Sequence, residues 1–233
     1  MLEWNRLACR PQRPAMSFAG PLAAPRPPAP APTPRAGVSR AKRAEDITVA
    51  AVLLIVLALP MLLIAVVIRL ETSGPALFRQ ERTGYGGRSF RMLKFRTMHH
   101  VATPLRQATR RDTRVTRVGA VLRRTSLDEL PQLINVLRGE MSMVGPRPHA
   151  PGTCAGGRPF EQITPAYTAR HRVRPGLTGL AQVRGLRGET ETEDKLMRRL
   201  QADLEYIERW SLRLDLLVLA RTTVAVVRMR NAY

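Results

Sequence analysis

The sequence predicts an α+β fold in which helices dominate and one segment belongs in a membrane. Three observations support this fold class. The residues from Ile47 to Ile68 form a 22-residue run whose only polar side chain is Thr48. Short alternating runs on either side of a glycine-rich turn are typical of a small β-hairpin. Later segments repeat apolar residues at helical spacing, as amphipathic helices do.

Composition narrows the choice of partners. The chain has 233 residues, with 38 Lys+Arg against 18 Asp+Glu, a formal net charge of +20. That excess favours polyanions such as nucleic acid, anionic lipid or phosphorylated small molecules. Aromatic residues make up only 5%, which argues against a surface that stacks bases. The four histidines lack the spacing of metal ligands, so a structural zinc site is not expected.

The first 44 residues should form a disordered tail. Nine of the nineteen prolines lie there, and proline removes the backbone donors that a helix needs. We therefore expect an extended, solvated segment over residues 1–44. A membrane helix should follow over residues 45–70, and one folded domain over residues 71–233.

The apolar run is long enough to enter a bilayer. At about 1.5 Å per residue it would measure roughly 33 Å as a helix, the thickness of a bilayer core. Pro60 lies inside it, and arginines and lysines flank both ends. A spanning helix usually has its basic excess on one side only. These features leave two hypotheses open: a kinked spanning anchor, or a re-entrant helix-break-helix that enters the membrane, breaks and bends at Pro60 and returns to the same face.

The remaining elements follow in order. Residues 76–95 read as a β-hairpin, with a helix beginning near Val118. Leu130, Leu133, Ile134 and Leu137 share one helical face that ends at Gly139. Residues 143–159 and 173–185 read as loops because of their Pro and Gly content. Residues 191–210 form an amphipathic helix, and the apolar, arginine-interrupted segment after it either lies on a membrane surface or packs on the core.

The segment RRTSLDELPQ, Arg123 to Gln132, carries the residues best suited to chemistry. Ser126 and Glu129 match a capping box, and Asp128 is the alternative helix cap because it would place Pro131 in the first turn. Asp128 and Glu129 are also adjacent carboxylates among arginines. Such a group suits phosphate, which arginine binds by two hydrogen bonds, and Mg2+, which prefers oxygen ligands.

Four long phrases resemble one family, the bacterial sugar transferases, which are monotopic polyprenyl-phosphate phosphoglycosyl transferases. The phrases are SGPALFRQERTGYGGRSFRMLKFRTM, TRVTRVGAVLRRTSLDELPQLINVLRGEMSMVGPRP, RVRPGLTGLAQVRG and DLEYIERWSLRLDLLVLARTTVAVVRMRNAY. They follow the family's order from about Lys42 to Tyr233, some four-fifths of the chain. The resemblance implies transfer of a sugar phosphate from a nucleoside-diphosphate sugar, typically UDP-linked, to undecaprenyl phosphate.

The resemblance also assigns roles to residues. It implies that Asp128 is the nucleophile that carries the phospho-sugar, and that Glu129 helps to hold Mg2+ or activates the incoming group. It implies that the dyad binds the metal and that Pro60 bends the membrane helix back to the cytosolic face. The candidate phosphate-binding residues are Arg123, Pro146 and Arg147, and less strongly Lys94, Arg96 and Arg174.

The implied setting is the inner membrane of a bacterium, with the catalytic domain, residues 71–233, on the cytosolic face. The partners would be undecaprenyl phosphate, the nucleotide sugar and the bilayer, with no nucleic acid; a homodimer is possible. The competing hypothesis is a non-catalytic, membrane-anchored basic adaptor or scaffold that binds anionic lipid or nucleic acid. The sequence does not select the sugar.

Overall fold

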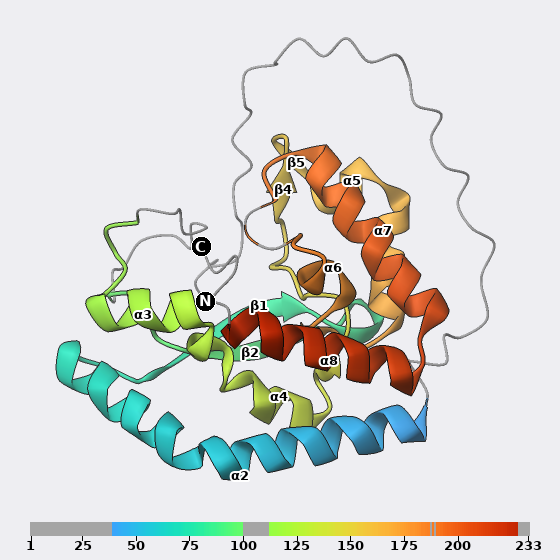
Figure 1. Cartoon of the computed structure of the whole chain (residues 1–233). Helices are drawn as coiled ribbons and strands as arrows, with labels where there is room; N and C mark the ends of the chain where they lie inside the picture. Colours follow the sequence, from blue (N-terminus) through green and yellow to red (C-terminus); the bar gives the residue numbers. More distant parts are fainter. Residues whose placement is uncertain (1–38, 100–111, 187, 189, 228–233) are drawn as a thin grey trace.

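The computed structural model describes residues 39–99, 112–186, 188 and 190–227. Most of the predicted tail and part of the basic loop after the hairpin lie outside these residues. The described part is α+β and dominated by helices, as predicted (Figure 1). Its longer elements are α2 (Arg40–Glu71), β1 (Leu77–Thr83), β2 (Ser89–Phe95), α3 (Arg117–Thr125), α4 (Gln132–Arg138), α7 (Glu193–Arg209) and α8 (Leu212–Val227).

Helix α2 contains the predicted membrane segment and begins earlier than the predicted residue 45. Ser39 is its N-cap, and the Ser39 side chain accepts a hydrogen bond from the Lys42 amide at 3.3 Å. Among the described residues, α2 alone is long and apolar enough to cross a membrane. One face packs on the protein and the other exposes large apolar side chains, which include Val52, Ile55, Val56, Leu59, Leu62, Leu63, Val66, Val67 and Leu70.

The predicted break at Pro60 is wrong in one respect, because α2 continues as a helix through this residue. Proline removes one backbone hydrogen bond and favours a bend, but the turns on both sides can continue the helix. The axis of α2 is visibly bent in Figure 1, where the helix runs along the lower edge of the molecule.

Both ends of α2 are bound to the same folded body. Near the N-terminal end, Arg43 donates hydrogen bonds to the carbonyls of Val136 and Leu137 in α4, at 2.7 and 2.8 Å. Beyond the C-terminal end, Arg96 of the segment after β2 donates to the carbonyls of Ser73 and Thr72, at 2.7 and 2.8 Å. Carbonyls near helix C-termini often lack intrahelical partners, and these two arginines bind carbonyls at the end of α4 and just beyond the end of α2.

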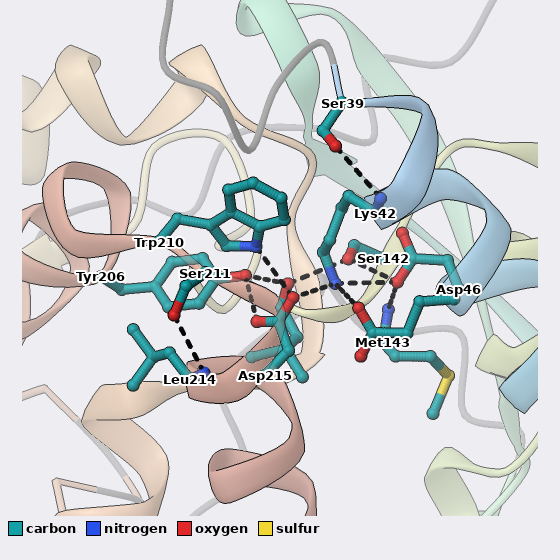
Figure 2. Close-up of polar contacts among 12 residues, drawn as sticks. Ser39, Lys42, Asp46, Ser142, Met143, Tyr206, Trp210, Ser211, Leu214 and Asp215 are labelled. Carbon is teal, nitrogen blue, oxygen red and sulfur yellow. Dashed lines mark hydrogen bonds and ion pairs between the residues drawn. The ribbon is translucent and has the colours of Figure 1, made fainter.

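A buried ionic cluster, which we call the Lys42 cluster, joins the start of α2 to α8 (Figure 2). Lys42 Nζ lies 3.0 Å from Asp46 Oδ1 and 3.0 Å from Asp215 Oδ2, and all three side chains are almost fully buried. Asp215 also accepts hydrogen bonds from Tyr206 and Trp210, both at 2.8 Å. The cluster also includes Ser142, which donates to Asp46 at 2.8 Å.

The predicted hairpin is confirmed. Strands β1 and β2 pair antiparallel, with Leu77 opposite Phe95 and Thr83 opposite Ser89. A short 3-10 turn, Tyr85–Gly87, joins them, and Gly86 and Gly87 have φ values of 63° and 75° that glycine adopts readily. The main core forms where β2 and α4 meet α7 and α8, and its buried residues include Met92, Leu133, Val136, Met143, Tyr206 and Val218.

Two segments predicted as loops contain short strands. Strand β3 (Ser142–Val144) pairs in parallel with β6 (Gly176–Thr178), and β4 (Cys154–Ala155) pairs with β5 (Arg158–Pro159). The backbone segments of β3 and β6 approach each other closely. A Cβ atom on Gly176 would lie 2.1 Å from the amide nitrogen of Gly145, which follows β3. Glycine was therefore a sign of close backbone contact here. Short helices α5 (Phe160–Ile163) and α6 (Leu180–Val183) and a 3-10 segment, η3 (Pro165–Arg172), complete this part.

One face of helix α8 packs on the core, as one of the two hypotheses for the C-terminal segment predicts. Contact of its other face with a membrane surface stays a prediction. Val218 is buried in the main core, and Leu214 and Leu219 pack against it. The opposite face exposes Leu216 and other apolar side chains. Asp215, one of the charged residues that interrupt the apolar pattern of this segment, is fully buried.

Candidate active site

The acidic dyad lies in a sharp connection between α3 and α4. Asp128 and Glu129 belong to a single 3-10 turn, η2 (Leu127–Glu129), which begins directly after Ser126. Ser126 has φ +60° and is the only non-glycine residue with positive φ in the described part of the chain. Such backbone strain is typical of functional sites. The two carboxylates therefore occupy a fixed turn.

Neither predicted helix cap is present. Ser126 makes no capping hydrogen bond, and α4 begins after Pro131, which serves as its N-cap without a side-chain bond. Pro131 has helical φ and ψ of −60° and −16°, so it can lead into the helix without an amide donor. Glu129 is thus free of the role that a capping box would give it, and its side chain turns to two cations.

Lys94 of β2 and Arg147 of the segment after β3 hold Glu129. Lys94 Nζ lies 3.0 Å from Glu129 Oε1. One Arg147 nitrogen donates to Glu129 Oε2 at 3.2 Å, and a second donates to Oε1. Asp128 Oδ2 lies 3.9 Å from Lys94 Nζ, beyond hydrogen-bond distance. The structure therefore brings four of the predicted site residues together from three separate parts of the sequence.

The electrostatics separate the two carboxylates. Burial opposes the charge of Glu129, but Arg147 and Lys94 outweigh it and hold the pKa of Glu129 far below its ordinary value. Burial raises the pKa of Asp128 to about 6, and the charge of Glu129 adds to this effect, although Lys94, Arg147 and Arg123 oppose it. Glu129 is thus a permanent anion that orients cations, whereas Asp128 is the more basic carboxylate.

The remaining predicted residues have different positions. Arg123, in the last turn of α3, is near enough for its charge to lower the pKa of Asp128. Pro146 precedes Arg147 and lines a small, shallow hollow with Arg147, Arg170 and His171. Arg123 and Pro146 therefore lie close to the group formed by the dyad, Lys94 and Arg147.

Arg96 and Arg174 bind backbone carbonyls instead. Arg96 holds the end of α2, and Arg174 Nε donates to the carbonyl of Gly139 at 2.9 Å. Gly139 follows α4 at the end opposite to the dyad. No contact of either residue supports the phosphate-binding role predicted for it, which stays a prediction.

Sequence reasoning missed the residues that support the dyad. Asn135 of α4 is fully buried; its side chain accepts from the Leu93 amide and donates to the Arg91 carbonyl, both at 2.9 Å. These bonds fix α4 against β2 and so place the dyad beside Lys94. The sequence signal was a polar residue on the buried side of a helix, which usually requires a specific partner.

The dyad also lies close to the membrane helix. Leu127 and Leu130 flank the two acids and pack against a buried cluster formed by Ile68 of α2, Phe95 and Leu122. Met61, Ile64 and Ala65 of α2 belong to the same packed group. The acids are thus held next to the apolar helix by their own neighbours in sequence.

The donor set fits Mg2+. Glu129 keeps one acceptor site on Oε2 beyond the hydrogen bonds that it receives, and the Asp128 carboxylate lies beyond hydrogen-bond distance of Lys94. Mg2+ commonly binds one or two carboxylates and completes its shell with water and substrate phosphates. No group of three or more His, Cys, Asp or Glu with metal-binding geometry occurs in the described residues, so the substrate would have to supply ligands.

The acidic dyad thus lies among basic side chains and beside a long apolar helix. The profile of the family described as bacterial sugar transferase matches residues 38–229, and the chain belongs to that family. This confirms the predicted family.

Relatives support the same assignment. The chain is 52% identical over 204 residues to the UDP-glucose:undecaprenyl-phosphate glucose-1-phosphate transferase of Caulobacter vibrioides. The matched region covers 87% of this chain and 75% of that protein. It is 51% identical over 195 residues to the undecaprenyl-phosphate glucose phosphotransferase of Komagataeibacter xylinus, covering 82% of this chain and 37% of that protein. For the Escherichia coli K12 UDP-glucose:undecaprenyl-phosphate glucose-1-phosphate transferase, the identity is 47% over 204 residues, 86% of this chain and 43% of that protein.

The chain thus spans less than half the length of the Komagataeibacter and Escherichia coli proteins and three-quarters of the Caulobacter protein. All three are named as transferases, which confirms the predicted enzyme class.

Proposed function

We propose that this protein transfers a sugar phosphate from a UDP-sugar to undecaprenyl phosphate and so begins the assembly of a bacterial polysaccharide. The observation that carries the proposal is the Asp128–Glu129 dyad, held between Lys94 and Arg147 next to α2. A soluble donor and a lipid acceptor can both reach phosphate-binding groups only at such a boundary. The names of the relatives supply the substrate class.

Asp128 is the better nucleophile of the two acids. Both oxygens of Glu129 accept hydrogen bonds from cations, which lowers their reactivity, whereas Asp128 has the raised pKa. In the first half-reaction an Asp128 oxygen forms a bond to the sugar-bearing phosphorus. The bond from that phosphorus to the bridging oxygen breaks, and UMP leaves with the electron pair.

In the second half-reaction a phosphate oxygen of undecaprenyl phosphate attacks the same phosphorus. The bond to Asp128 breaks, the carboxylate returns to its free form, and the lipid carries the sugar diphosphate. Lys94, Arg147 and Arg123 stabilise the negative charge on the phosphoryl oxygens in both steps. Mg2+ held by Asp128 and Glu129 would add charge neutralisation on the diphosphate.

The direct test measures UMP release. Purified protein is incubated with Mg2+, undecaprenyl phosphate and a panel of UDP-sugars, in which UDP-glucose comes first because the relatives carry its name. We expect UMP release that stops with EDTA and resumes with added Mg2+. No release with any UDP-sugar would contradict the proposed function. The adaptor or scaffold hypothesis, which predicts that result, has no support from the comparisons.

The pH dependence should follow Asp128. The nucleophile must be ionised, and burial raises its pKa to about 6, so activity should rise with pH through that region. Lys94→Met removes a positive charge that lowers this pKa. The acid limb of the pH–rate profile should then move to higher pH, so the variant loses more activity at pH 6 than at pH 8.

A matched control is Lys195→Met, which removes a lysine near the start of α7, far from the dyad in sequence. Its profile should match that of the wild-type protein. An acid limb that stays in place or moves to lower pH in Lys94→Met would contradict the electrostatic role of Lys94.

We further propose that α2 enters the membrane from one face and returns to it, with the catalytic domain on the cytosolic side. The support is geometric: Arg43 near one end and Thr72 beyond the other are both hydrogen-bonded to the same folded body. A straight spanning helix would separate its ends by about 30 Å of hydrocarbon. The exposed apolar face of α2 would contact lipid tails.

Cysteine labelling tests this topology. In a variant without the native cysteines, Arg40→Cys and Arg69→Cys place single thiols at exposed positions near the two ends of α2. A membrane-impermeant reagent should label both from the cytosolic side of inverted vesicles and neither from the outside of intact spheroplasts. Labelling of the two positions from opposite sides would contradict the re-entrant arrangement.

A further inference from the structure

A second buried network lies behind Arg147 and takes no part in the proposed chemistry. Its centre is Arg170 of η3, whose side chain is nearly fully buried and pairs with Asp203 of α7 at 2.7 Å. Removing two charges from water is unfavourable, and such a pair often adds no net stability. A buried pair of this kind therefore calls for a structural or functional reason.

Arg170 binds the segment that carries Arg147 at two points. One terminal nitrogen donates to the main-chain carbonyl of Arg147 at 2.7 Å. The other donates to His149 Nδ1 at 2.5 Å. Burial, together with the charge of Arg170, holds the pKa of His149 well below its ordinary value, so the imidazole is neutral and Nδ1 can accept. One guanidinium thus holds the residues on both sides of Pro148.

The segment reaches the dyad directly. The Arg147 main chain is held by Arg170, and the Arg147 side chain donates to both oxygens of Glu129. Asp203 balances the charge of Arg170 and fixes the orientation of its planar group. The contacts form one continuous path from α7, through Arg170, to the acidic dyad.

We propose that Arg170, paired with Asp203, is a positioning residue that holds the Arg147–His149 segment so that the Arg147 guanidinium reaches Glu129 and the substrate phosphate. Arg170 acts through Arg147 and makes no contact with the dyad. The inference rests on the proposed function. It extends that function by assigning a task to two charged residues outside the site.

A double-mutant cycle on UMP release tests the proposal. Arg147→Ala should lower kcat by about a hundredfold, as expected for loss of one group that stabilises developing charge. Arg170→Gln should lower kcat about tenfold to a hundredfold, because small misplacements of catalytic groups have effects of that size. In the double variant Arg170→Gln should add less than about threefold, since residues that act through one another are not additive. Effects that multiply would overturn the inference.

Arg199→Gln is the matched control. Arg199 is a buried arginine of α7 that donates to Thr190 and to the Gly188 carbonyl. Its charge acts on Asp203 and His149, as that of Arg170 does, so it controls for loss of a buried charge next to the same network. Its replacement should leave kcat within about threefold of wild type, because Thr190 and Gly188 lie outside the Arg147–His149 segment. A loss in Arg199→Gln equal to that in Arg170→Gln would show a general packing effect and overturn the inference.

Arg170→Lys is a second test variant, for the case in which Arg170→Gln does not fold. Lysine keeps the charge opposite Asp203 but has no planar group that reaches two acceptors. We expect a folded protein with kcat lowered about tenfold, and no such loss in the Arg147→Ala background. An undiminished kcat in Arg170→Lys would count against the positioning role.

Hydrogen–deuterium exchange separates this inference from the proposed function. Peptides that cover residues 145–149 should exchange faster in Arg170→Gln than in wild type or Arg199→Gln, whether or not UMP is released. Unchanged exchange there would overturn the positioning role. An absence of UMP release from the wild-type protein would instead contradict the proposed function.

Discussion

Replacing Asp128 with asparagine is expected to abolish UMP release, with a loss of about ten-thousandfold or more, as for removal of other catalytic nucleophiles. The change preserves the size of the side chain and removes the negative charge and the nucleophilic oxygen. Arg147 and Lys94 still bind Glu129, so the fold of the turn should persist. Initial rates with UDP-glucose and undecaprenyl phosphate measure the effect.

Asp194→Asn is the control for this substitution. Asp194 lies exposed in the first turn of α7, and its replacement should leave UMP release within about twofold of wild type. Equal thermal stability of the two variants would exclude unfolding as the cause of a loss. Turnover in Asp128→Asn close to that of Asp194→Asn would rule out Asp128 as the nucleophile.

The largest effect on stability is expected for Lys42→Met. The change leaves Asp46 and Asp215 buried without the ammonium that lies 3.0 Å from each, and Glu45 loses a cation at 3.8 Å. Removing one partner of a buried ion pair costs about 3–5 kcal/mol. For a domain of this size that corresponds to a Tm lowered by roughly 10 °C, measured by thermal unfolding in nanodiscs.

An exposed ion pair provides the comparison. Arg158 and Glu193 lie 3.2 Å apart with about half of each side chain exposed, and such surface pairs contribute about 0–1 kcal/mol. Arg158→Met should therefore change Tm by only a few degrees at most. If Lys42→Met lowers Tm no more than Arg158→Met does, the Lys42 cluster is not a stabilising link between α2 and α8.

Periodicity and composition were sufficient to predict the long elements. The apolar run became α2, the alternating runs became the β1–β2 hairpin, and the leucine pattern before Gly139 became α4. The start of α2 was misplaced because Lys42 resembles part of a polar flank, although it is buried in an ionic cluster with Asp46. Strands β3 and β6 were missed because three residues are too few to show a period.

The part of the site whose residues are adjacent in sequence could be predicted. Asp128 and Glu129 are adjacent in sequence, so their proximity required no knowledge of the fold. Arg170 and Asp203 are 33 positions apart, and each alone resembles a surface charge. Arg96 was predicted to bind phosphate, but its side chain binds a carbonyl at the end of α2. A basic residue can do either, and the sequence around Arg96 does not distinguish the two roles.

The most direct measurement is intact-protein mass spectrometry after incubation with Mg2+ and UDP-glucose in the absence of undecaprenyl phosphate. If Asp128 carries the phospho-sugar, the protein gains the mass of one hexose phosphate, and peptide mapping places it on Asp128. The Asp128→Asn variant should show no gain. UMP release that requires undecaprenyl phosphate and leaves no covalent adduct would contradict the central claim, because the sugar phosphate would then pass directly from donor to lipid.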